Sequence, residues 1–152
     1  MCFSEKIDYY LAKEIDGLWR QDKISWDVVS YYMIGPVICE VEKMGDGFLI
    51  LFDENYIDEY SHDSVLYGVV LYAISKMVAI EMGVNTNDKY EVCKHWLSAI
   101  EATDRYFGKD NCFWNMLAYI DYDLCEMIMD KYERRWGRKR EYPNPRLIYE
   151  GC

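Results

Sequence analysis

The sequence contains none of the short motifs that mark phosphate-binding loops, dinucleotide-binding turns or the nucleophile elbow of hydrolases. It has no GxxxxGK[ST], no GxGxxG and no GxSxG, so these kinds of nucleotide and ester chemistry are not indicated. Histidine is also scarce, because His62 and His95 are the only two in the chain. General acid–base catalysis would have to rely on carboxylates, which are too abundant here to single out a site. The sequence therefore identifies no catalytic residue and predicts no cofactor.

Six cysteines are present, but no two of them form a CxxC pair. The chain has no N-glycosylation sequon, and its first residues, MCFSEKIDYY, contain no apolar run of the kind a secretory signal needs. We therefore expect a cytoplasmic protein with free, reduced thiols. Cys93 and His95 would point about 200° apart on a helix, so a zinc ion would also need Cys112 or Cys125. Neither a metal site nor a cysteine nucleophile is favoured.

The formal charge of −10 is unevenly distributed. Residues 1–130 hold 24 acidic and 10 basic side chains, a formal charge of −14. Residues 131–152 hold seven basic and three acidic side chains, a charge of +4. A body this acidic repels nucleic acid and is steered towards basic partners. Direct nucleic-acid binding is therefore not expected.

The longest apolar stretch covers residues 65–80 and reads VLYGVVLYAISKMVAI. It is shorter and more interrupted than a membrane span, which needs ~20 predominantly apolar residues, so no membrane contact is expected. A helix that is apolar on nearly all sides is typical of the middle of a hydrophobic core. We expect Asp63 or Ser64 to cap its start and Gly83 to end it.

The hydrophobic pattern predicts an α+β fold that is predominantly helical, with about five helices and one β-hairpin. The hairpin is expected over residues 37–42 and 48–53, which flank a loop rich in turn formers. It should pack on the central buried helix, because two strands alone are marginally stable. Gly35-Pro36 should end a short second helix, because proline disfavours the helical conformation in the residue before it and lacks a backbone donor itself. The expected helices cover approximately residues 4–20, 26–34, 65–82, 89–107 and 112–136.

The loop over residues 53–63, DENYIDEYSHD, is the densest polar cluster. Its side chains could hold calcium or magnesium, which bind oxygen ligands. The loop nevertheless departs from the EF-hand pattern, because it lacks the glycine and places Ile57 where a ligand should be. A solvated loop or a partner contact through Asp58 and Glu59 explains it equally well.

The most specific pattern lies on the last expected helix. Its spacing of four, three, four and three residues puts a tyrosine and four carboxylates on one face, with neighbours ~5–6 Å apart. Such a row could present itself to a basic groove in place of DNA or RNA. A solvated helix face is the alternative, relieved in part by Asp130 and Arg134 at i,i+4. The row consists of Tyr119, Asp123, Glu126, Asp130 and Glu133.

A basic cluster follows the acidic row. We expect one globular domain over residues 1–137 and an extended basic tail over residues 138–152. The cluster could bind an acidic partner or fold back on the acidic body. It consists of Arg134, Arg135, Arg138, Lys139 and Arg140.

These features together predict a small acidic protein that is not an enzyme and that blocks a basic partner, such as a nuclease or another nucleic-acid-binding enzyme. Viral anti-defence inhibitors, such as anti-CRISPR proteins, and toxin-neutralising immunity proteins share this physical profile. The resemblance is one of composition. The alternative is a small enzyme or metal-dependent ligand-binding protein that uses the acidic loop at 53–63.

Overall fold

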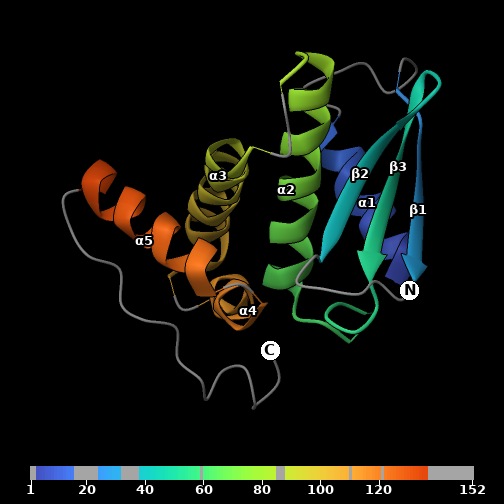
Figure 1. The fold of residues 1–152 in the computed structure, drawn as a ribbon. Helices are drawn as coiled ribbons and strands as arrows, with labels where there is room; N and C mark the ends of the chain where they lie inside the picture. Colours follow the sequence, from blue (N-terminus) through green and yellow to red (C-terminus); the bar gives the residue numbers. More distant parts are fainter. Residues whose placement is uncertain are drawn as a thin grey trace.

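Five helices and a three-stranded sheet make up the described part of the chain in a computed structural model (Figure 1). This confirms the predicted α+β class with mainly helix. The described residues are 3–15, 24–31, 38–58, 60–84, 88–109, 111–120 and 122–136, so the predicted tail at 138–152 lies outside them. In chain order the elements are α1 (Phe3–Ile15), β1 (Trp26–Tyr31), β2 (Cys39–Met44), β3 (Gly47–Asp53), α2 (Asp63–Glu81), α3 (Lys89–Phe107), α4 (Cys112–Ile120) and α5 (Tyr122–Trp136).

The sheet has the order β1-β3-β2, in which β2 runs antiparallel and β1 parallel to the central strand β3. The predicted hairpin is confirmed, because β2 and β3 pair from Met44 opposite Gly47 to Cys39 opposite Phe52. Gly45 turns the chain with a φ of 59°, a left-handed conformation that glycine adopts at little cost.

The short helix predicted over residues 26–34 is wrong, because its first residues form β1. Trp26 and Val28 are half-buried, whereas Asp27 and Val29 are exposed, which is the two-residue alternation of a strand. Apolar residues in so short a segment fit a helical and an extended period equally well. Parallel pairing with the apolar strand β3 selects the extended conformation for this segment.

The helices α1 and α2 pack on the same face of the sheet, and α3 lies on the other side of α2 (Figure 1). Phe48, Ile50 and Phe52 point from β3 into the core, and each is at most 2% exposed. They share one hydrophobic cluster with side chains from all five helices. α4 packs against α2, and α5 packs against α3 and α4. The described elements are therefore organised around α2, as the apolar stretch predicts.

Twelve of the 19 residues of α2 are buried. By length and composition α2 could cross a membrane, so the expectation that this segment is too short for a span is not supported. The core helix of a soluble domain can have the same length and composition. In this structure, 61% of the most apolar 18-residue stretch of α2 is buried inside the fold. Its burial against neighbouring elements accounts for its composition.

The ends of α2 follow the prediction only in part. The N-cap is His62, and its side chain makes no capping hydrogen bond. Ser64 instead accepts a hydrogen bond from the backbone N–H of Cys112 at 3.0 Å, which joins the start of α2 to the start of α4. Gly83 ends the helix with a φ of 74°, as expected.

The single helix predicted over residues 112–136 is two helices, α4 and α5. No glycine or proline lies between the end of α4 at Ile120 and the start of α5 at Tyr122. The break lets each half bury its own apolar side: Phe113 and Leu117 lie in the core beside α2, and Ile128 lies where α5 meets α3. Tertiary packing decides this boundary, because the helical period is unbroken in the sequence.

The described cysteines divide into two groups. Cys39, Cys93 and Cys125 are buried thiols that form no disulfide bond, and they pack as small apolar side chains would. Burial raises the pKa of Cys39 to about 12. Cys112 is disulfide-bonded, so the expectation of free thiols is wrong at this position. The spacing of cysteines along the sequence does not predict which of them lie close enough in the fold to form a disulfide bond.

Candidate functional site

Four carboxylates lie along the solvent side of α5. Asp123, Glu126, Asp130 and Glu133 are all exposed. The opposite side of the same helix is apolar and buried, which fixes the orientation of the exposed side. Its buried residues are Leu124, Cys125, Ile128, Met129 and Tyr132. We call the four exposed carboxylates the acidic face of α5.

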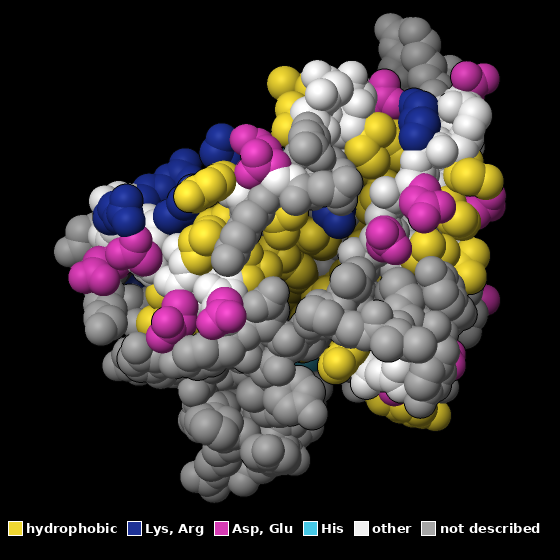
Figure 2. All heavy atoms as spheres, in the orientation of Figure 1, with side chains coloured by type: hydrophobic (Ala, Val, Ile, Leu, Met, Phe, Trp, Pro, Cys, Tyr) yellow, Lys and Arg dark blue, Asp and Glu magenta, His cyan; other side chains and the backbone are white. Residues whose placement is uncertain are grey.

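Basic side chains lie next to the acidic face. Arg134 forms an ion pair with Asp130, and both side chains are more than half exposed. Arg135 forms an ion pair with Glu101 of α3 at 3.4 Å, and Lys131 lies 5.7 Å from the centre of the Tyr90 ring. Figure 2 shows acidic and basic groups side by side over α5 and α3. The field of the acidic face is therefore partly neutralised at its C-terminal end.

Three of the four carboxylates have no basic partner in the part of the chain that the structure describes. Among the described residues, no ion pair engages Asp123, Glu126 or Glu133. Exposed ion pairs such as Asp130–Arg134 contribute only ~0–1 kcal/mol and exchange easily with solvent or a partner. The acidic face can therefore still offer four carboxylates to a basic surface.

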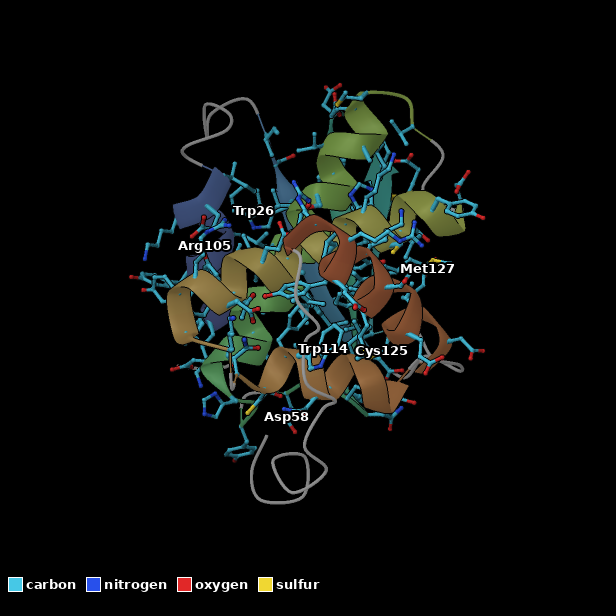
Figure 3. The ribbon with its side chains drawn as sticks, turned by 90° about the vertical axis from the view of Figure 1, so that its left-hand side faces the viewer. Trp26, Asp58, Arg105, Trp114, Cys125 and Met127 are labelled. Carbon is cyan, nitrogen blue, oxygen red and sulfur yellow. The ribbon has the colours of Figure 1, made fainter. Side chains whose placement is uncertain are left out.

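The structure does not bring the other predicted partner-binding residues onto this face. Tyr119 belongs to α4, so the helical spacing that linked it to Asp123 does not hold. Glu59 lies outside the described residues. Asp58 is exposed in the loop before α2, and Figure 3 shows it on the far side of α4 from Met127 of α5.

The acidic loop uses its side chains to shape its own turns. Asp53 is fully buried, and its Oδ1 accepts a hydrogen bond from the N–H of Asn55 at 2.9 Å. Asp58 accepts a hydrogen bond from the N–H of Tyr60 at 2.8 Å, and its own N–H donates to the Ser61 hydroxyl. Within the described ranges, no three potential metal ligands come together. The described part of this loop therefore holds no cluster of ligands that would support the metal-dependent alternative.

A serine–histidine contact occurs at the start of α2 but cannot act as a nucleophilic pair. The Ser64 hydroxyl lies 3.3 Å from Nδ1 of His62. Ser64 is only 1% exposed, and its oxygen already accepts the hydrogen bond from Cys112. A substrate could not reach this hydroxyl, so the contact is structural.

His95 on α3 is a half-buried titratable group to which the sequence assigns no role in the fold. Its Nε2 is buried without a hydrogen-bond partner among the described residues. Burial lowers the pKa of His95 and outweighs the opposing effect of Glu91, while Lys76 and Lys94 lower the pKa further. The folded protein therefore favours the neutral imidazole.

This lowered pKa predicts a loss of stability in mild acid. Below the ordinary histidine pKa of about 6.5 the unfolded chain binds a proton that the folded protein resists, so stability falls as pH decreases. We expect the melting temperature of His95→Gln to fall less than that of the wild type between about pH 7.5 and pH 5.5. His62→Gln, at the other histidine, is the matched control. Equal pH dependence in the wild type and His95→Gln would contradict this account.

Neither a known protein family, nor a curated protein, nor a solved structure matches this chain. Function must therefore be argued from the surface itself.

Proposed function

We propose that the protein is a small, acidic, non-enzymatic inhibitor that binds a basic partner through the acidic face of α5. The supporting observation is that Asp123, Glu126, Asp130 and Glu133 are all exposed on one continuous helix whose opposite side is buried. A rigid helix holds these carboxylates at fixed spacing without a further cost in backbone order. The protein would act as inhibitors of the anti-defence or immunity type do, by occupying a site rather than by chemistry.

The acidic face carries a regular row of charges, as a nucleic-acid strand does, but with a wider spacing. From Asp123 to Glu133 the helix rises ~15 Å and carries four negative charges, which is one charge per ~5 Å. A single DNA strand carries one phosphate per ~3.4 Å. The acidic face is thus less dense in charge than a strand, and the −14 body adds the long-range attraction that speeds encounter with a basic partner.

The proposal can be tested by capture of partners from a lysate at low and at high salt, followed by mass spectrometry. We expect a basic, nucleic-acid-binding protein that is released at high salt and displaced by duplex DNA or RNA, because charge pairing is screened by salt. Capture of a protein that survives high salt and is not displaced by nucleic acid would contradict the proposal. A metal ion or nucleotide found bound by native mass spectrometry would favour the alternative at residues 53–63.

A further inference from the structure

The exposed side of α1 carries opposite charges at its two ends, so it is complementary in charge to a second copy of the same side that runs antiparallel. Glu5, Tyr9 and Lys13 are exposed and recur every four residues, so they lie in one row along the helix. The buried side of the same helix holds Ile7 and Leu11, both fully buried. The row therefore begins with a negative charge, has an aromatic ring at its centre and ends with a positive charge.

An aromatic surface adjoins this row. Tyr106 of α3 is 61% exposed and Tyr9 is 57% exposed, which is large for aromatic side chains. A chain of ring contacts connects them through Tyr10 and Tyr67, with centroid distances of 5.7, 6.0 and 5.1 Å. The ammonium group of Lys13 lies 5.8 Å from the centre of the Tyr106 ring. Exposed tyrosines held by packed neighbours are typical of the centre of protein interfaces.

We propose that the outward row of α1 binds the same row of a second copy of this chain, with the two helices antiparallel about a two-fold axis at Tyr9. In this arrangement Glu5 faces Lys13 of the second copy, and the symmetry repeats the pair. The two pairs lie ~12 Å apart along the helix axis, with the Tyr9 rings between them. A parallel pairing would instead place Glu5 against Glu5, so the charge order selects the antiparallel one. A two-fold interface of this kind uses one patch twice.

The dimer is expected to be weak and to leave the acidic face free. A single 13-residue helix is ~20 Å long, so the contact falls at the small end of specific interfaces. A charge of −10 on each copy also opposes association. In Figure 1 α1 and α5 lie at opposite sides of the molecule, so this surface is independent of the one proposed for the basic partner.

Reversing the charges of Glu5 and Lys13 tests this antiparallel pairing specifically. Sedimentation velocity should show a wild-type dimer that forms in the micromolar to millimolar range. E5K or K13E alone creates two like-charge contacts and should weaken the dimer by roughly tenfold. The double variant E5K/K13E restores both pairs with their signs exchanged and should return the Kd to near the wild-type value. E54K, an equal change of charge to E5K at the exposed loop residue Glu54, lowers the net negative charge in the same way and should not weaken the dimer.

Folding must be checked, because both reversals oppose the helix macrodipole. Circular dichroism melts serve this purpose, and Tyr9→Ala offers a second variant, since alanine favours the helix while removing the central ring. Tyr9→Ala should abolish the dimer and retain the fold. A wild type that stays monomeric throughout the range, or a double reversal that binds no better than either single one, would overturn the proposal.

Discussion

Replacing Gly68 with alanine should lower the free energy of unfolding by about 1–3 kcal/mol, the usual cost of overpacking a core. In an exposed helix the same substitution would raise stability by about 1 kcal/mol. The difference arises because a Cβ at Gly68 would lie 2.4 Å from Cγ of Phe113 and 2.6 Å from both of its Cδ atoms. Phe113 is fully buried and also contacts Trp96, with ring centres 5.2 Å apart, so its ring has little room to move.

The partner substitution makes this a complete thermodynamic cycle. Phe113→Ala should cost about 3–5 kcal/mol, the usual loss for a buried phenylalanine. With the ring removed, the new Cβ at position 68 enters open space, so Gly68→Ala should be neutral or stabilising by up to about 1 kcal/mol in that background. Chemical denaturation of the four proteins measures the coupling. An equal cost of Gly68→Ala in both backgrounds would show that α2 and α4 do not meet here.

This contact also shows how much of the fold is predictable from the sequence. The run at 65–80 predicts a buried central helix because a helix that is apolar on nearly all sides is typical of the middle of a core. It does not predict that Gly68 is the point at which α4 approaches. A glycine on a buried helix leaves room for a close approach, but only the structure shows that the ring of Phe113 occupies this room.

Two boundaries could not be predicted because long-range packing sets them. The first is β1, where six residues fit both periods and pairing with β3 places Val28 opposite Ile50. The second is the break between α4 and α5, which no glycine or proline signals. In both places the local pattern is compatible with the structure, but a partner distant in sequence selects it.

The candidate site, too, is predictable from the sequence only where its residues belong to one helix. The spacing from Asp123 to Glu133 correctly predicts four exposed carboxylates, because these residues stay on one helix. The prediction that Tyr119 shares this face is wrong, because Tyr119 belongs to α4 and helical spacing does not continue from α4 into α5. The sequence does not predict the aromatic surface of Tyr9 and Tyr106, because these residues belong to helices α1 and α3, which only the fold brings together.

Neutralising the acidic face should weaken binding to the basic partner by roughly tenfold or more, mainly through slower association. The variant D123N/E126Q/D130N removes three charges and nearly preserves shape. Its stability should change by less than about 0.5 kcal/mol, as is usual for exposed positions. Relief of repulsion along α5 offsets the loss of the Asp130–Arg134 pair and of an acidic residue in the first turn.

A matched control separates this face from net charge alone. E40Q/E42Q/E54Q removes the same number of charges from exposed residues, two on β2 and one in the loop after β3. Both triple variants have the same formal charge, so long-range attraction weakens equally in the two. Only a direct contact with α5 distinguishes them.

The most direct measurement is the association rate constant of the wild type and both triple variants for the captured basic partner, over a range of salt concentrations. The account predicts that D123N/E126Q/D130N associates more slowly than E40Q/E42Q/E54Q and with a weaker dependence on salt. Equal rates for the two variants, with both folded, would contradict it and leave the acidic face of α5 an ordinary solvated surface.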